Sequence, residues 1–370
     1  MTITLIQWYP YRVPFCHHFT NAHGKMAVRE GAIVEVFVEG HLSGSGEIAP
    51  LPDFGGETLN EALSTLGTVT SALVGLTITE ALHRLHVQQE AGELPSSALC
   101  GLEIALLDAL GRQQGCSMST LLAPSAQVVR PLVPVNAVIG GAQSIAATVQ
   151  QACDAVAAGF SCLKLKMCSG LDDEIERVSA VRGAVGSEIH LRLDANAAWT
   201  FEQARTILTA CEPLTIQYVE QPLPAYDLTG MYQLRQEVSI PIAADEAVYH
   251  LESARRVLTW EAADILIIKP QLAGGLRAGL RIIDEAANYH VPCVVTSTIE
   301  TGIGLLGALH LAAASPHITL ACGLATLHLL EDDCVLEELS LQDGALVLPQ
   351  GPGLGVELDR AALAKYAVTL

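Results

Sequence analysis

Basic residues are scarce in this chain, and their scarcity excludes two classes of partner. The 370 residues include 20 lysines and arginines against 40 aspartates and glutamates, which leaves a formal net charge of −20. Nucleic acids and anionic membrane surfaces bind to basic faces, so we expect neither as a partner. Three of the few lysines lie inside apolar, strand-like runs, which makes them unusual: Lys164, Lys166 and Lys269.

Long hydrophobic runs and disulfide motifs are also missing. No apolar stretch reaches the roughly 18 residues of a membrane-spanning helix without a charge or a turn residue. The first residues, MTITLIQWYPYRVPF, do not join a basic segment to an apolar one as signal peptides do. The ten cysteines include no CxxC pair, so we expect buried, reduced thiols and a cytoplasmic protein.

The first 125 residues predict an α+β capping domain. Strand-like segments occur at 2–9 and 32–39, and apolar residues recur at helical spacing at 57–73 and 96–110. Between the two strands lies a polar stretch, 17–29, which contains three histidines. We expect this stretch to form a mobile loop that closes over the functional site.

From 126 to 345 strands alternate with helices, which predicts a modified TIM barrel of the (β/α)7β type. The last helix is short or degenerate. The turn-rich tail, 346–370, is expected to return to the capping domain and complete it. The strand-like runs lie at 133–139, 162–167, 190–195, 216–221, 240–244, 265–269, 293–298 and 318–322. The clearest helical segments between them lie at 144–158, 171–185, 201–210 and 276–289.

Charged residues stand near the carboxyl ends of successive strands of this barrel. Because these ends meet at one mouth, the side chains are expected to converge there. Three carboxylates without histidine or cysteine nearby suit Mg²⁺, with Mn²⁺ as the alternative ion. The simpler alternative is that each carboxylate caps a helix or pairs with an arginine. The charged residues are Lys164, Lys166, Asp194, Glu220, Asp245 and Lys269, and from Lys166 onward they follow in steps of 28, 26, 25 and 24 residues.

The lysines supply groups that can move protons. Lys164 and Lys166 are two apart on a strand, so they share a face, and their mutual repulsion and partial burial are expected to lower the pKa of a lysine base. Lys269 lies across the mouth and can serve as a second acid/base or as a fixed cation. A metal on a substrate carboxylate would acidify the adjacent C–H, a lysine would remove the proton, and the metal would hold the enediolate.

Five motifs identify the chain as a member of the enolase superfamily, and within it as similar to the muconate-lactonizing subgroup. They are KLK at 164–166, DAN at 194–196, VEQP at 219–222, ADE at 244–246 and IKP at 268–270. The resemblance covers essentially the whole chain and implies the capped barrel and the Mg²⁺ chemistry described above.

Within that subgroup the chain most resembles the o-succinylbenzoate synthases of menaquinone and phylloquinone synthesis. The matching segments are AHGKMAVREG at 22–31, GEIAPLPDFGGETL at 46–59, TSTIETGIG at 296–304 and CGLATLHLLEDD at 322–333. The resemblance implies a syn dehydration of 2-succinyl-6-hydroxy-2,4-cyclohexadiene-1-carboxylate. Lys166 would be the base and then protonate the departing hydroxyl, and Lys269 would lie as a cation over the ring face of the intermediate.

The same resemblance implies residues that contact a small carboxylate substrate. Arg192 and Asn196 match positions around the third strand of the barrel, and Ser297 and Gly323 match positions on its last two strands. Arg29 either helps to hold the mobile loop, meets a substrate carboxylate, or forms a structural ion pair with Glu30 or Glu47. A metal cluster of His17, His18 and His23, and a catalytic Glu300, are weaker alternatives.

Other activities of the subgroup remain open at this stage. N-succinylamino-acid racemases use a base on each face of the substrate, and both lysines are present here. Dipeptide epimerases usually carry Asp-x-Asp at the last strand, where this chain has CGLA at 322–325. Another lactonizing or racemizing activity is a further alternative. A non-catalytic barrel would be expected to lose some of these buried charges, and none is lost. Monomeric and homo-oligomeric states are both compatible with the sequence.

Overall fold

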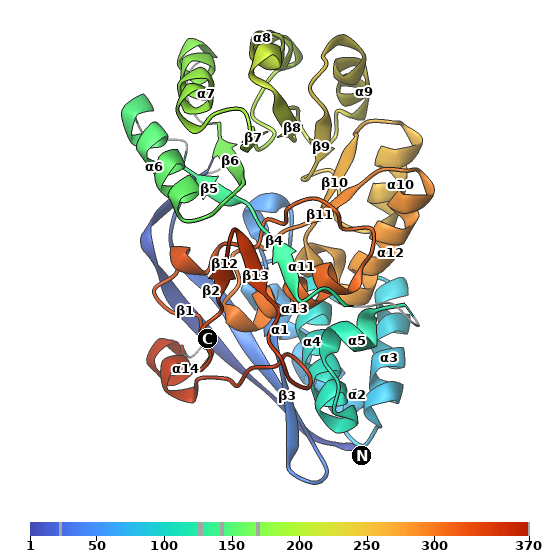
Figure 1. Cartoon of the computed structure of the whole chain (residues 1–370). Helices are drawn as coiled ribbons and strands as arrows, with labels where there is room; N and C mark the ends of the chain where they lie inside the picture. Colours follow the sequence, from blue (N-terminus) through green and yellow to red (C-terminus); the bar gives the residue numbers. More distant parts are fainter. Residues whose placement is uncertain (22–23, 125–128, 141–143, 168–170, 369–370) are drawn as a thin grey trace.

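A computed structural model of the chain describes residues 1–21, 24–124, 129–140, 144–167 and 171–368. An antiparallel sheet with its helices is followed by a parallel, curled sheet ringed by helices, so the fold is an α/β, TIM-barrel-like architecture with an N-terminal domain (Figure 1). None of the helices in these described segments combines the length and apolar character that a bilayer crossing requires.

The N-terminal sheet is a meander of three strands, β1 (Ile3–Asn21), β2 (Gly24–Val38) and β3 (Leu42–Ile48). The expectation of a loop over 17–29 is wrong for the described residues, because β1 and β2 continue as a hairpin in which Phe19 pairs with Met26. Backbone pairing therefore reaches almost to the tip of this segment. Residues 22 and 23, and with them His23, lie outside the described residues.

Five helices accompany this sheet. The predicted helix at 57–73 divides at Thr65 into two, and the predicted helix at 96–110 is confirmed as α4. α4 packs directly on β3 and also contacts α3. These helices are α1 (Leu59–Ser64), α2 (Leu66–Leu73), α3 (Ile78–Glu90), α4 (Ser96–Gln114) and α5 (Met118–Leu122).

The parallel sheet has seven strands in the order β11-β10-β9-β8-β7-β6-β5, which is sequence order reversed. Consecutive strands pair in parallel, as expected when each returns through a helix. The strands are β5 (Ala137–Ile139), β6 (Cys162–Lys166), β7 (His190–Asp194), β8 (Ile216–Glu220), β9 (Ile242–Ala244), β10 (Ile265–Ile268) and β11 (Cys293–Val295).

Helices cover the outside of this sheet (Figure 1). Four of the predicted helices are confirmed within one residue at either end: α6 (Ile145–Ala157), α7 (Leu171–Val185), α8 (Phe201–Cys211) and α12 (Leu276–Asn288). The others in this region are α9 (Leu228–Glu237), α10 (Leu251–Thr259), α11 (Pro270–Ala273) and α13 (Gly302–Ala314).

The first and last predicted barrel strands differ from expectation. The run at 133–139 is split, and its first part, β4 (Leu132–Pro134), joins β12 (Leu341–Gln342) and β13 (Ala345–Val347) in a separate antiparallel sheet. The run at 318–322 makes only isolated parallel bridges, from Cys322 to Val135 and from Gly323 to Thr296. These bridges connect the two edges of the seven-stranded sheet, so the barrel is closed by a short segment.

Two acids connect the N-terminal domain to two barrel helices. Glu47 of β3 accepts hydrogen bonds from the backbone of Thr301 and Gly304, both at 2.8 Å, at the start of α13. Glu103 of α4 accepts one from Leu276 at 2.5 Å, at the start of α12. A helix amino terminus presents unpaired N–H groups and a positive partial charge, so these carboxylates stabilise the contact between the domains.

The C-terminal tail lies against the N-terminal domain. The guanidinium of Arg360, at the start of α14 (Arg360–Tyr366), is 2.6 Å from the buried carboxylate of Glu35 on β2. The backbone N–H of Val368 donates to Pro10 on β1 at 2.9 Å. Residues 360–368 therefore contact β1 and β2 of the N-terminal sheet.

Gly46 allows β3 to approach α4 closely, and its replacement by alanine is predicted to destabilise the protein. A Cβ at Gly46 would lie 2.0 Å from the Gly101 carbonyl oxygen and 2.6 Å from the Ala105 nitrogen, both backbone atoms. We expect Gly46→Ala to cost about 1–3 kcal/mol of unfolding free energy, measured by urea titration. Gly67→Ala is the control, because a Cβ at Gly67 of α2 meets nothing within 4 Å. Equal stability of Gly46→Ala and wild type would contradict this packing.

Candidate functional site

Strand register brings the charged residues to one mouth of the barrel. Lys166 on β6 is the direct partner of Asp194 on β7, and Asp194 is the partner of Glu220 on β8. Glu220 pairs in turn with Ala243 on β9, two residues before Asp245. This register places the charged residues at the same height in the barrel, as the spacing predicted.

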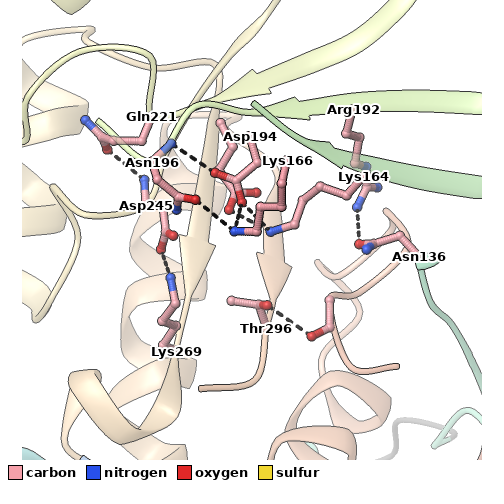
Figure 2. Close-up of polar contacts among 12 residues, drawn as sticks. Asn136, Lys164, Lys166, Arg192, Asp194, Asn196, Gln221, Asp245, Lys269 and Thr296 are labelled. Carbon is pink, nitrogen blue, oxygen red and sulfur yellow. Dashed lines mark hydrogen bonds and ion pairs between the residues drawn. The ribbon is translucent and has the colours of Figure 1, made fainter. Parts of the chain in front are cut away.

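The ammonium and carboxylate groups form a buried network (Figure 2). Lys166 Nζ is 2.6 Å from Asp194 Oδ2, and Lys164 Nζ lies 3.0 Å from the same atom and 2.8 Å from Glu220 Oε1. Lys269 Nζ forms an ion pair with Asp245 Oδ1. All six charged residues are at most 7% exposed. Each carboxylate therefore has a lysine as its ion-pair partner, and not an arginine or a helix end.

This pairing reverses the expected effect on the lysine pKa values. Burial alone would lower the pKa of Lys164, but the carboxylates of Asp194 and Glu220 raise it well above its usual value. Burial would likewise lower the pKa of Lys269, and Asp245 and Glu246 raise it. The prediction that lysine–lysine repulsion lowers the Lys164 pKa is thus wrong for this arrangement, because attraction by the acids is stronger.

The carboxylates respond in opposite directions. Burial would raise the pKa of Asp194, yet the two ammonium groups beside it, Lys164 and Lys166, hold it far below its usual value. Burial, and then the negative charge of Asp194, raise the pKa of Glu220 to about 7. Burial also raises the pKa of Asp245 despite the Lys269 ammonium. Glu220 therefore lacks sufficient positive charge nearby to be a stable anion.

The donor chemistry fits a hard divalent cation. Three carboxylates on adjacent strands supply oxygen ligands, and the raised pKa of Glu220 indicates that further positive charge would be favourable here. In the described segments no three acidic, histidine or cysteine side chains converge as closely as one metal ion requires. The carboxylate oxygens that would bind an ion form ion pairs with the lysine ammonium groups in this structure.

Gln221 positions Asp245 and was missed in the sequence. Its side-chain oxygen accepts from the backbone N–H of Asp245 at 2.9 Å and of Ala247 at 3.3 Å, and its amide donates to the Leu223 carbonyl at 2.8 Å. Gln221 follows Glu220 directly in the VEQP motif, and this position was the available signal. The side chain fixes the start of the loop that carries Asp245.

Four residues with side chains adopt left-handed backbone conformations at the strand ends around this site. They are Asn196 (φ 45°), Ala197 (φ 59°), Gln221 (φ 36°) and Ile299 (φ 64°). Such conformations are uncommon outside glycine, and those seen at functional sites persist only where the surroundings hold them. Ile299 is the least expected of the four, because its side chain is branched at Cβ.

A cavity of about 610 Å³, including its open mouth, lies above the charged network. Its floor carries the lysines and two of the carboxylates, and its walls are largely apolar. Lys269 Nζ is 5.0 Å from the centre of the Phe54 ring, which comes from the N-terminal domain. The apolar lining residues that the structure describes are Met26, Leu51, Phe54, Val138, Ile299 and Leu329.

Arg192 does not reach the cavity, which makes the expectation of a substrate contact wrong for this arrangement. Its guanidinium bonds to Gln217 at 2.7 Å, Asn136 at 3.0 Å and the Ala321 carbonyl at 2.7 Å, and stacks on Tyr218 at 4.7 Å. The side chain is 0% exposed. Arg192 lies one layer below Asp194 inside the barrel. There it connects Asn136 and Ala321, which lie beside the bridge that closes the barrel.

The other expected substrate contacts lie at the cavity. Asn196 accepts from Lys166 Nζ at 3.0 Å, and Ser297 Oγ is 3.0 Å from Thr326 Oγ1. Gly323 also lines the cavity, but its N–H donates to Val295 and its carbonyl accepts from Ser297. The backbone of Gly323 is therefore already bonded, contrary to the expectation that it would hold a carboxylate.

Arg29 and Glu300 have structural partners at this site. Within the described part of the chain, Arg29 donates to backbone carbonyls, among them Ile299 at 3.0 Å, and forms no ion pair with Glu30 or Glu47, so that expected pairing is wrong. Glu300 accepts from the backbone and hydroxyl of Thr298, at 2.9 and 2.8 Å, and so orients the loop after β11. The side chains of His17 and His18 lie outside what the structure describes.

Two family models match the chain. One, described as enolase C-terminal domain-like, matches residues 147–362, and the other, described as MenC, N-terminal domain, matches residues 3–109. The first contains all six charged residues of the network. The second contains the segment that supplies Met26, Leu51 and Phe54 to the cavity.

Relatives of several activities resemble the chain. A hydrophobic dipeptide epimerase of Enterococcus faecalis is 32% identical over 341 residues, 91% of this chain and 94% of that protein. An o-succinylbenzoate synthase of Thermobifida fusca is 38% identical over 222 residues, 59% of this chain and 67% of that protein. An N-succinyl-L-Arg/Lys racemase of Bacillus cereus is 26% identical over 372 residues, 100% and 98% of the two.

A solved structure supports the likeness of the fold. The dipeptide epimerase of Enterococcus faecalis, in complex with Mg and the dipeptide L-Leu-L-Tyr, superposes with a TM-score of 0.89 at 31% identity. The match covers 96% of this chain and 99% of that one.

The raised pKa of Glu220 predicts how stability depends on pH without metal. Its folded-state pKa of about 7 exceeds the unfolded value of about 4.3, so the stability that protonated Glu220 contributes is present below about pH 4.3 and is lost as pH rises through about 7. With EDTA present, the free energy of unfolding should fall less between about pH 5 and about pH 8 in Glu220→Gln than in wild type.

Glu202→Gln, which removes an exposed carboxylate on α8, serves as the control and should follow the wild-type profile. A Glu220→Gln profile parallel to wild type would contradict the raised pKa.

Proposed function

Because the chain belongs to the enolase superfamily, we propose that it is a metal-dependent o-succinylbenzoate synthase, a carbon–oxygen lyase of menaquinone or phylloquinone synthesis. Its substrate would be 2-succinyl-6-hydroxy-2,4-cyclohexadiene-1-carboxylate, a small dicarboxylate with an apolar ring. The match of residues 3–109 to the MenC N-terminal domain supports this choice, as does the identity to the Thermobifida fusca synthase.

The lining of the cavity carries the proposal. Three ammonium groups stand at its floor beside three carboxylates, so a bound divalent cation would leave an excess of positive charge that suits a dianion. The apolar walls match the apolar body of that substrate. A dipeptide brings an α-ammonium group, which needs an acidic or carbonyl partner. Among the lining residues that the structure describes, the acids are Glu220 and Asp245, and both are paired with lysines.

Lys166 is the proposed base. Its Nζ would take the proton from the ring carbon that carries the carboxylate and return it to the departing hydroxyl on the same face, which releases water and leaves an aromatic ring. Lys166 now donates to Asp194 and Asn196. Sharing the Asp194 carboxylate with a further cation would favour the neutral amine that a base requires.

Asp194, Glu220 and Asp245 are the proposed ligands of Mg²⁺, with Mn²⁺ as the alternative. The ion when bound would supply positive charge to the substrate carboxylate as negative charge develops there. Gln221 would hold the Asp245 backbone in place for this role. Lys269 would stay protonated on the other side of the cavity, where its charge opposes the developing anion.

N-succinylamino-acid racemisation is the second candidate. Lysines come from β6 and from the end of β10, so a proton acceptor is available on each side of the cavity. The N-succinyl-L-Arg/Lys racemase of Bacillus cereus, a relative over the full length of the chain, supports this alternative.

All nine cysteines of the described segments are free thiols, which supports the expected cytoplasmic setting for either reaction.

The deciding experiment assays the purified protein for both reactions with Mg²⁺ and with EDTA. Formation of o-succinylbenzoate, followed spectrophotometrically, supports the proposal. Racemisation of N-succinyl amino acids without any dehydration would replace it with the second candidate, and neither activity in the presence of Mg²⁺ would refute both.

The three carboxylates are predicted to be required for metal binding and turnover. Asp194→Asn, Glu220→Gln and Asp245→Asn should each lower the affinity for Mg²⁺ by at least about 10-fold, measured by titration calorimetry, and abolish dehydration. Asp264→Asn is the control, because Asp264 precedes β10 at the other end of the barrel and pairs with Arg235. Full activity in any of the three variants would contradict the ligand assignment.

Substitutions at the two lysines should separate the reactions. Lys166→Ala is expected to lower kcat by several orders of magnitude, because base and metal charge act together. Lys269→Arg keeps the charge but cannot release a proton usefully, so some dehydration should survive while racemisation disappears. If Lys269→Arg still racemised N-succinyl amino acids but no longer catalysed dehydration, the assigned roles of the two lysines would be wrong.

A further inference from the structure

The loop between β11 and α13 forms one wall of the catalytic cavity and contains a strained residue. Thr296, Ser297, Thr298 and Ile299 all line the cavity. Ile299 has φ of 64°, in the region that favours glycine and that β-branched residues rarely enter. Such a conformation persists only where neighbouring groups hold it, so the question is which groups do so here.

Two groups hold the peptide units on either side of Ile299. Within the loop, the Ile299 N–H donates to Ser297 Oγ at 2.7 Å. From the N-terminal domain, Arg29 Nε donates to the Ile299 carbonyl at 3.0 Å. The donor on the carbonyl side is therefore a side chain of the other domain.

Arg29 is itself fixed, so it can act as a rigid support. Its other nitrogens donate to the carbonyls of Glu30 at 2.9 Å, Pro50 at 2.8 Å and Ala49 at 2.7 Å. The side chain is 4% exposed and lies on β2. The planar guanidinium thus connects the segment that precedes Leu51, another lining residue, to the strained loop.

The remaining contacts between the domain and this loop lie on either side of Ile299. Thr298 Oγ1 donates to the Ala49 carbonyl at 3.3 Å, and Thr301 donates to Glu47 through both its backbone and its hydroxyl. These bonds keep the loop near the domain. They do not hold the Ile299 carbonyl. Among the described residues, the donor to this carbonyl is Arg29.

We propose that Arg29 is a positioning residue that sets substrate specificity by holding Ile299 in its left-handed conformation. It touches no reacting atom and acts through the shape of the wall. With the carbonyl of Ile299 held, the isoleucine side chain stays in the cavity lining, where it would meet the apolar body of the substrate. The proposal rests on the catalytic cavity proposed above, but not on which of the two reactions occurs there.

The test is a double-mutant cycle with the substrate that the wild type turns over, so failure of the synthase assignment does not prevent it. Arg29→Met is combined with Ile299→Gly, which adopts this φ without strain, and with Ile299→Val, which keeps the branched Cβ. The readouts are kcat, KM, Mg²⁺ affinity and the thermal unfolding midpoint. Arg12→Met is the matched control, because Arg12 lies on the same hairpin and pairs with Glu30 at the surface.

We expect Arg29→Met to raise KM at least about 10-fold while kcat falls less than about 3-fold, because lost shape weakens uniform binding of the substrate. Ile299→Val should preserve this response to Arg29→Met, and Ile299→Gly should reduce it to less than about 3-fold. Arg12→Met should leave KM unchanged. Arg29→Lys keeps the positive charge but has fewer hydrogen-bond donors, so it should give a KM between those of wild type and Arg29→Met. It replaces Arg29→Met in the test if that variant does not fold.

The same change in KM in the Gly and Val backgrounds would overturn the proposal, because the arginine would then not act through the strained residue. A lower unfolding midpoint with an unchanged KM would also overturn it and leave a purely structural role.

Discussion

The pairing of buried lysines with buried carboxylates is the interaction on which the rest of this structure depends. Each of these charges would be costly in the barrel interior without an opposite charge beside it. Strand register supplies the partners, since Lys166, Asp194 and Glu220 occupy one row across three strands. The pairing also keeps the catalytic groups at fixed positions, while the raised pKa of Glu220 leaves the site receptive to a further cation. Stability and the proposed chemistry therefore use the same side chains.

The two domains contribute different parts of the cavity. The barrel contributes the charged floor, and the N-terminal domain contributes Met26, Leu51 and Phe54 to the walls. Their relative position is set by polar contacts in which Glu47 and Glu103 bind the amino ends of α13 and α12. Because both carboxylates accept backbone N–H groups of barrel helices, and Glu47 is fully buried, these contacts hold the walls against the floor. Changes in the N-terminal domain can thus alter what binds without altering the lysines or carboxylates.

Much of this arrangement could be read from the chain. The helices α6, α7, α8 and α12 were predicted because their apolar residues recur at helical spacing. The row of charges was predicted because parallel strands of similar length, separated by similar helices, end at one mouth. A full strand was predicted at 318–322, but this run makes only an isolated bridge at Cys322. The hairpin that pairs Phe19 with Met26 was not predicted, because the polar residues of this stretch hide the strand pattern.

The sequence by itself determined the fold class, the family and the identity of the charged residues, because these follow from local periodicity and from residue type at regular spacing. Only the tertiary structure decided how each charge behaves. Lys164 has a raised pKa because two carboxylates outweigh the effect of burial, and Arg192 lies below the cavity because Asn136 and Gln217 bind it there. Arg29 supports a strained loop 270 positions away in the chain. Electrostatic and hydrogen-bonding partners depend on distances in space, which spacing along the chain does not record.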